Sequence, residues 1–347
     1  MFKFTLSALK ISLLVAASCA TASAQSITVV AFGGEGQASQ APAYYEPFEK
    51  ATGAKVVAAE YNGELGKVKS MVNTNSVQWD VVQVESPELE RGCAEGIFEK
   101  LDYSKIMPRD AFIDGADHDC GVGTIVWSVV MAYNTDKIKD APSTWADFWN
   151  VQKYPGKRAL RKGAKYNLEF ALMADGVPAK EVYAVLGTPE GVDRAFKKLD
   201  EIKSNIQWWE SGAQPQQYLV AGDVVMSSSY NARVTTAVKK DNRPLALVWP
   251  ESIYALDYWA IPKGSKNTEL AQKFIQVASE SKNLVHYSEL MPYGPTTKES
   301  VQNLPPALAE TLPSSEKNME HALALDVDFW TDYGESLEQR YNSWVAQ

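Results

Sequence analysis

The stretch 223–262, DVVMSSSYNARVTTAVKKDNRPLALVWPESIYALDYWAIP, decides how the rest of the chain is interpreted. It predicts a buried strand at Val224–Ser228, then a turn and a helix that begins at about Ala232. Two further runs of apolar, β-branched and aromatic residues, Leu245–Trp249 and Tyr254–Ile261, predict two more strands. Strands that alternate with helices in this way are typical of an α/β fold.

Two charged residues stand out in this stretch because they lie beside aromatic side chains. Arg233 falls in the first turn of the predicted helix, just after Tyr230, and Asp257 falls inside an apolar strand. A carboxylate would meet the guanidinium group of Arg233 through two hydrogen bonds, and an ammonium group would meet Asp257. The pattern therefore predicts a site for a small ligand that carries both charges. The alternative is that Arg233 and Asp257 pair with each other, since buried ion pairs also occur without a function.

The first hundred residues predict a parallel sheet covered by helices. The runs Ser26–Phe32, Lys55–Glu60 and Trp79–Val84 have strand composition, and helical patterns separate them. Ligands of such sheets bind beyond the carboxyl ends of the strands, so the polar residues that follow the strands belong to one edge of a cleft. Each of these residues alone could equally be a solvated loop residue. The polar residues that follow the strands are Glu35, Gln37, Glu85 and Ser86.

A long apolar run at Thr124–Tyr133 predicts a strand that passes between two lobes. Two lobes are also expected from the length of the chain, because more than 300 residues exceed what one core usually supports. Trp127 lies within this run and is predicted either to line the ligand pocket or to pack in the core.

The composition argues against two classes of partner. The chain has a formal net charge of −9, which becomes more negative when the basic leader described next is removed. This acidity disfavours nucleic acids and anionic membranes as partners.

Residues 1–24 are predicted to be a cleaved signal peptide. Lys3 and Lys10 form its positive region, Ile11–Ala17 its apolar region, and Ala22–Ser23–Ala24 fits the rule of small residues at a cleavage site. The mature chain would begin near Gln25. Cys19 leaves open the alternative of lipid attachment, although the usual bulky aliphatic residue three positions earlier is missing.

Two cysteines, Cys93 and Cys120, follow the leader. An even number of cysteines in an exported protein predicts one disulfide. A metal site is not expected, because a zinc site needs about four ligands and His118 is the only histidine nearby.

Several segments, taken in order, resemble a known family. Ser143–Trp149 followed by Tyr154–Lys157 is similar to the "SWADLW…YKG" segment of periplasmic spermidine/putrescine-type solute-binding proteins of ABC importers. Leu247–Pro250 with Leu256–Pro262 resembles their "VVWP…D…AIP" block, and Met291–Thr296 their "GYPTP" turn. The resemblance covers nearly the whole mature chain.

This resemblance implies a type II-like periplasmic-binding-protein fold, an α/β fold in which two lobes, joined by crossing strands, close on a ligand. The expected lobes are residues 25–132 plus 259–303 and residues 133–258 plus 304–347. A monomer in the periplasm that delivers its ligand to a permease of the inner membrane is also implied. No cofactor is expected.

The family also implies roles for particular residues. Its members hold a terminal ammonium group with an aspartate at the place of Asp257, and they place aromatic residues at Tyr230 and at about Tyr293. The complete set of predicted ligand-binding residues is Arg233, Asp257, Tyr230, Glu85, Ser86, Gln37, Trp127, Tyr293 and Trp330.

The ligand predicted from these residues is a short amino acid such as 4-aminobutyrate. Lys162, Lys165 and Asn167 stand roughly where polyamine binders have acidic residues, and Arg233 would repel a polycation. A binder of putrescine or spermidine is the main alternative. A ferric-ion binder that uses Tyr44–Tyr45 is a more distant one.

An enzyme is not expected. The chain has three histidines, and the serines at Ser227–Ser229 lack the pattern of a nucleophile elbow.

Overall fold

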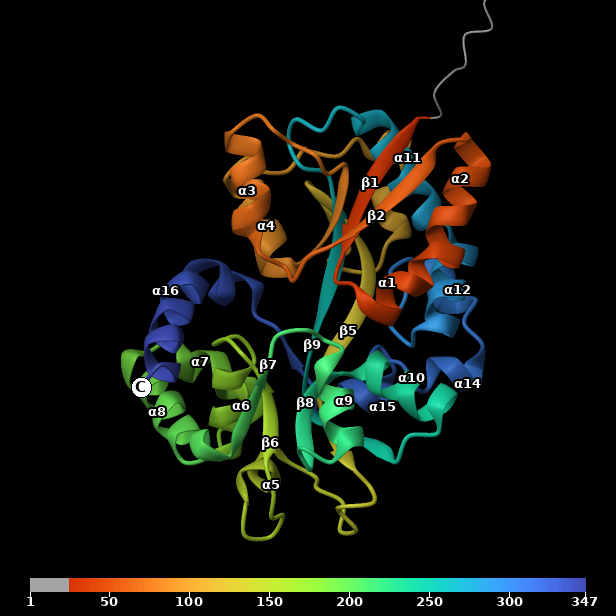
Figure 1. Ribbon diagram of the computed structural model, residues 1–347. Coiled ribbons are helices and arrows are strands. Elements are labelled where there is room, and N and C mark those ends of the chain that lie inside the picture. Colours follow the sequence, from red (N-terminus) through yellow and green to blue (C-terminus); the bar gives the residue numbers. More distant parts are fainter. Residues whose placement is uncertain (1–24) are drawn as a thin grey trace, which may run out of the picture.

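The computed structural model describes residues 25–347 as a two-lobed α/β molecule (Figure 1). The predicted signal peptide, its cleavage after Ala24 and the lipid alternative at Cys19 lie outside the described residues. One sheet of ten strands runs through both lobes in the order β2-β1-β3-β9-β5-β8-β6-β7, with β10 and β4 at its margins. The predicted α/β class is therefore confirmed.

The first lobe, drawn in the upper half of Figure 1, is built on three parallel strands, as predicted. Apolar residues of β1, such as Val29 and Val30, are fully buried between helices on both faces of the sheet. A π-helical turn at Ala41–Tyr45 joins the first two helices. The strands are β1 Ser26–Ala31, β2 Lys55–Glu60 and β3 Val81–Glu85, and the helices are α1 Gly34–Gln40, α2 Glu46–Thr52, α3 Leu65–Asn73, α4 Ser86–Ala94, α11 Thr268–Ala278 and α12 Ser281–Leu290.

Two long antiparallel strands, β5 Gly121–Asn134 and β9 Leu245–Ala260, cross from one lobe to the other. The predicted crossing strand at Thr124–Tyr133 is thus confirmed. The two strands predicted at Leu245–Trp249 and Tyr254–Ile261 form one continuous strand instead. The strand continues through Pro250 because a local bulge accommodates the proline. At this bulge Glu251 has a positive φ of 61°, and the register with β5 shifts.

The second lobe adds three strands to the far side of β5. Strand β8 pairs with β5 in antiparallel fashion, and β6 lies parallel to both β8 and β7. The strands are β6 Arg158–Arg161, β7 Ile206–Trp209 and β8 Met226–Tyr230. Strand β4 Asp117–His118 pairs with the first-lobe end of β5, and β10 Leu323–Ala324 pairs with the middle of β9. The helices are α5 Trp145–Trp149, α6 Asn167–Ala174, α7 Val182–Leu186, α8 Pro189–Asp200, α9 Gln214–Ala221 and α10 Asn231–Asp241.

The last part of the chain returns along the molecule. Helix α16 lies against the second lobe and also contacts α4 of the first lobe. The residue bounds predicted for the two lobes, 25–132 plus 259–303 and 133–258 plus 304–347, stay a prediction. The remaining helices are α13 Lys298–Gln302, α14 Pro306–Ala309, α15 Glu316–Met319 and α16 Val327–Val345.

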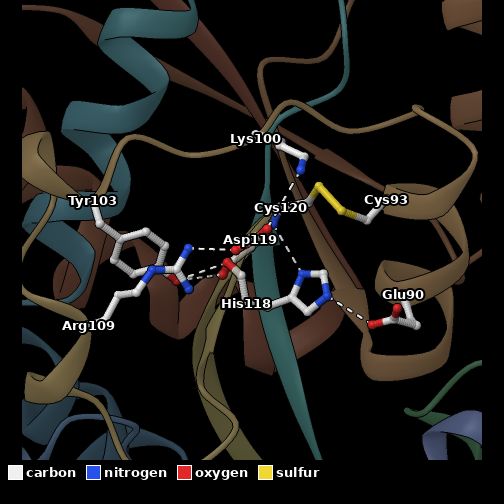
Figure 2. The surroundings of a disulfide bond; sticks show 9 residues. Glu90, Cys93, Lys100, Tyr103, Arg109, His118, Asp119 and Cys120 are labelled. Atoms are coloured by element: carbon white, nitrogen blue, oxygen red, sulfur yellow. Dashed lines mark hydrogen bonds and ion pairs between the residues drawn. A yellow bond between two sulfur atoms is a disulfide. The ribbon is translucent and has the colours of Figure 1, made fainter.

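The predicted disulfide is confirmed: Cys93 of α4 is bonded to Cys120, and their Cα atoms lie 5.8 Å apart. Figure 2 shows polar pairs on both sides of this bond. His118 Nε2 lies 2.9 Å from Glu90 Oε2, and an Asp119 oxygen accepts from Arg109 at 2.7 Å. The bond ties α4 to the beginning of the crossing strand β5.

No helix within residues 25–347 is both long and apolar enough to span a membrane.

Candidate ligand-binding site

A cavity of about 60 Å³ lies where the carboxyl ends of strands from both lobes meet. Phe32 and Glu85 reach it from the ends of β1 and β3, while Arg161 and Tyr230 reach it from the ends of β6 and β8. The placement follows the general rule for α/β sheets, in which ligands bind beyond the carboxyl ends of the strands.

Asp257 lies in β9 on the first-lobe side of the cavity and is almost fully buried. Its carboxylate accepts a hydrogen bond from Gln83 Nε2 at 2.7 Å and another from Trp127 Nε1 at 2.6 Å. Burial raises the pKa of Asp257 well above its ordinary value, and the negative charge of the neighbouring Glu85 raises it further. Because neutral donors alone hold it, Asp257 offers a cation-binding position.

Glu85 is the cross-strand neighbour of Asp257, since the two are register partners in the β3–β9 ladder. Its carboxylate lies 2.7 Å from Lys165 Nζ and 3.6 Å from Arg161 Nη1, and it accepts a hydrogen bond from the Tyr166 hydroxyl at 2.7 Å. Burial opposes its ionisation, but the charges of Lys165 and Arg161 outweigh this effect and lower the pKa of Glu85 to about 2. Glu85 is therefore an ionised acid that the protein itself neutralises.

Arg233 lies in the first turn of α10 and also lines the cavity. Its Nη2 donates to the carbonyl of Gly33 at 3.3 Å, and its buried Nε has no hydrogen-bond partner among the described residues. Neither Asp257 nor any other acid of residues 25–347 forms an ion pair with this guanidinium group, so the alternative of a direct Arg233–Asp257 pair is not seen. A cation with free donors is suited to an anionic ligand group.

Small residues make room for Arg233. A Cβ atom at Gly34 would lie 2.9 Å from its Nη1, and one at Gly212 would lie 2.9 Å from its Nε. Gly34 also has a positive φ of 62°, which residues other than glycine rarely adopt. The glycine loop after β1 therefore lets the backbone approach the guanidinium group closely.

Aromatic rings form a further part of the cavity wall. The ring of Trp127 packs edge-on against Tyr230, with centroids 5.5 Å apart, and Tyr230 in turn packs against Trp209 at 5.9 Å. Tyr293 lies close enough to Arg233 and Asp257 for both charges to affect its pKa. Burial raises its pKa to about 12, with the Arg233 guanidinium lowering this value and the Asp257 carboxylate raising it.

The structure brings most of the sequence-predicted ligand residues to this cavity. Two lie elsewhere. The hydroxyl of Ser86 donates to the carbonyl of Leu256 at 2.8 Å, and Trp330 lines a separate groove between α4 and α16, where its Nε1 donates to Glu169 at 2.7 Å. The predicted residues that do line the cavity are Arg233, Asp257, Tyr230, Glu85, Gln37, Trp127 and Tyr293.

Sequence reasoning missed several polar residues of the cavity. Arg161 ends strand β6, so the rule of strand ends could have identified it. Gln83 lies inside β3, and the Gln40 amide donates to its Oε1 at 2.8 Å. Gln83 lies two residues before Glu85, so the alternation of side chains along a strand places both on the same face and could have identified Gln83.

The Tyr44–Tyr45 pair of the ferric-ion alternative does not reach the cavity. Both rings are buried, Tyr44 against Tyr287 with centroids 5.0 Å apart and Tyr45 against Phe274 at 6.0 Å. Burial raises the pKa of both hydroxyls above the ordinary value. This opposes the ionised form that a hard metal would require. The part of the chain that the structure describes contains no group of three or more His, Cys, Asp or Glu side chains placed to hold a metal ion.

Comparison with known proteins places this architecture among solute-binding proteins. The gamma-aminobutyric acid-binding protein of Pseudomonas aeruginosa is 55% identical over 331 residues, which are 95% of this chain and 94% of that one. The structure of the GABA receptor Atu4243 is 34% identical and superposes with a TM-score of 0.82, covering 93% of this chain and 98% of that chain. AgtB from A. tumefaciens R10, solved in complex with agropinic acid, is 29% identical with a TM-score of 0.85, over 93% and 99% of the two chains.

The sequence model of the family "Bacterial extracellular solute-binding protein" matches residues 43–314. The spermidine/putrescine-binding periplasmic protein 1 of Haemophilus influenzae is more distant, at 24% identity over 276 residues, or 76% of this chain and 74% of that one. The predicted relation to spermidine/putrescine-type binding proteins and the two-lobed fold are confirmed. The chain therefore belongs to the bacterial extracellular solute-binding proteins and, as predicted, is a binding protein rather than an enzyme.

Proposed function

We propose that this protein captures 4-aminobutyrate (gamma-aminobutyric acid) between its two lobes. In this proposal the ammonium group of the ligand meets Asp257, its carboxylate meets Arg233, and the aromatic rings of Trp127, Tyr230 and Tyr293 enclose its methylene chain. Gln37 and Glu85 complete the wall.

The observation that carries the proposal is the pattern of unpaired charge in one cavity. Asp257 is held by neutral donors only, and Arg233 has a carbonyl oxygen as its hydrogen-bond acceptor. A short zwitterion would supply the partner that each group lacks, and desolvated charge pairs of this kind bind strongly. The names of two similar proteins, a gamma-aminobutyric acid-binding protein and a GABA receptor, support the same ligand.

Putrescine or spermidine is the second candidate, favoured by the distant likeness to a spermidine/putrescine-binding protein and by the cation position at Asp257. Arg233 and Arg161, which also line the cavity, argue against it, because a polycation would meet like charges there.

The biological setting is proposed from the family. The protein would act as a monomer in the periplasm after cleavage near Ala24, and would present its closed form to an ABC permease of the inner membrane. Nucleic acids are not expected as partners. Closure of the lobes around the ligand would be the signal that the permease reads.

Titration calorimetry with 4-aminobutyrate, putrescine, spermidine and proline tests the proposal. Tight binding of 4-aminobutyrate with weak or absent binding of both polyamines is the expected result. Proline, whose ammonium and carboxylate groups are separated by a single carbon atom, is the control for charge without length. Tight putrescine binding with no response to 4-aminobutyrate would overturn the zwitterion assignment.

A further inference from the structure

Glu85 separates the ligand cavity from a neighbouring groove that lies between α4 and α16. It lines the cavity, whereas Lys165, which holds it, lines the groove. Lys165 therefore contacts Glu85 from the groove and not from the cavity. Its Nζ lies 2.7 Å from a Glu85 oxygen and 2.9 Å from a Glu88 oxygen, and its side chain is only 11% exposed.

The loop that carries Lys165 is held firmly in place. It connects β6 to α6, and Glu338 of α16 accepts hydrogen bonds from the backbone N–H groups of Ala164 at 2.9 Å and of Lys165 at 3.3 Å. The next residue, Tyr166, has a positive φ of 76° and donates its hydroxyl to Glu85. The backbone contacts of the loop fix the position of Lys165, and the ion pairs with Glu85 and Glu88 hold its ammonium group.

The consequence is a difference between the two acids of the cavity. Arg161 and Lys165 both contact Glu85, while Asp257 has no cation within ion-pair distance among residues 25–347. A zwitterion leaves the net charge of this cluster unchanged. A diamine would add two positive charges and find only one acid without a cation, so it would be repelled.

We propose that Lys165 is a specificity-determining residue: by occupying Glu85 from the groove, it withholds the second carboxylate that a diamine would need. This inference rests on the proposed function and extends it to the residue that rejects the competing ligand class. Lys165 acts through Glu85 and does not itself touch the ligand.

The test compares Lys165→Met with the unmodified protein by titration calorimetry with 4-aminobutyrate and putrescine. The variant leaves Arg161 as the one cation beside Glu85 among residues 25–347, so the affinity for putrescine relative to 4-aminobutyrate should rise at least about tenfold. The double variant Glu85→Gln/Lys165→Met should lose this gain, because the freed acid is absent. Lys165→Gln, which keeps a donor toward Glu85, replaces the Met variant if the latter does not fold.

Two further variants separate the proposed role from a general change in charge. Glu88→Gln/Lys165→Met should keep the gain, since Glu88 does not line the cavity. Lys69→Met removes a lysine that pairs with Glu95 at 2.7 Å on the surface and should leave the ratio unchanged. An unchanged putrescine-to-4-aminobutyrate ratio in a folded Lys165→Met variant would overturn the inference. That result is distinct from failure of the proposed function, in which the unmodified protein itself would not bind 4-aminobutyrate.

Discussion

The Asp257 end of the cavity and the Glu85 corner beside it hold the same chemical group in opposite states. The two acids face each other across the β3–β9 ladder, and both are buried. At the Glu85 corner, two cations lower the pKa to about 2. At the Asp257 end, burial and the nearby Glu85 charge raise the pKa well above its ordinary value.

The difference teaches how a site can contain two acids and still offer only one. The surroundings of Glu85 already supply the charge and donors that an ammonium ligand would otherwise provide. Asp257 accepts hydrogen bonds from two uncharged side chains, Gln83 and Trp127, which orient its carboxylate but supply no positive charge. An incoming ammonium group therefore gains most at Asp257.

Replacement of Asp257 by Asn should have the largest effect on this comparison. The variant keeps the shape of the side chain but removes the charge that would meet the ammonium group, so the affinity for 4-aminobutyrate should fall about 1000-fold. Calorimetry gives the dissociation constants. Asp223→Asn, an exposed position on the approach to β8, is the control. A loss below about tenfold would mean that the ammonium group lies elsewhere.

Replacement of Arg233 by Ala tests the proposed contact with the ligand carboxylate. The affinity for 4-aminobutyrate should fall about 100-fold, because the ligand carboxylate would lose its cation. Binding of putrescine, which has no carboxylate, should weaken little or improve. Arg243→Ala removes an exposed arginine just after the same helix and should change neither ligand. Equal losses for both ligands would argue against a carboxylate contact at Arg233.

A third buried acid, Glu169, extends the comparison to an acid outside the cavity. Burial raises its pKa to about 7, and its donors are Trp330 and Tyr183. Since this value exceeds the ordinary one, the folded state binds the proton more tightly, and stability should be lost as the pH rises from the ordinary pKa through 7. Relative to Glu169→Gln, the unmodified protein should lose roughly 2 kcal/mol between pH 5 and pH 8. Urea unfolding at both pH values measures this. Parallel stability curves for the two proteins would contradict it.

The raised pKa of Asp257 also predicts that Asp257 releases a proton when the ligand binds. An ammonium group lowers the pKa of the acid it meets, so affinity should increase with pH by up to about tenfold per unit while Asp257 loses its proton. Calorimetry in buffers of different ionisation enthalpy measures the proton count. The release should vanish in Asp257→Asn, and a pH-independent affinity in the unmodified protein would show that Asp257 is already ionised.

Much of this arrangement could be predicted from local sequence. The rule that ligands bind beyond strand ends identified Gln37 and Glu85, and the isolated charges beside aromatic residues identified Arg233 and Asp257. Arg161 was missed although it is the last residue of β6, because the rule was applied only to the strands of the first hundred residues.

The remaining features depend on tertiary contacts. The hydrogen bond that Gln83 donates to Asp257 depends on the register of β3 against β9, which pairs Gln83 with Trp259 and Glu85 with Asp257. Lys165 was recognised only as a departure from the polyamine binders, because its contact with Glu85 joins residues that are 80 positions apart in the chain. The position of Trp330 depends on how α16 packs across both lobes. No local pattern encodes these relations.

The place of β9 in the sheet also has a consequence for how the chain is made. In the first lobe β9 lies between β3 and β5, so this sheet cannot be completed until residue 260 has left the ribosome. At ordinary elongation rates of about 5–20 residues per second, the 126 residues that separate the end of β5 from the end of β9 take roughly 6–25 seconds to synthesise. For at least that interval the edges of β3 and β5 that pair with β9 lack their partner, and unpaired edges of apolar strands favour aggregation.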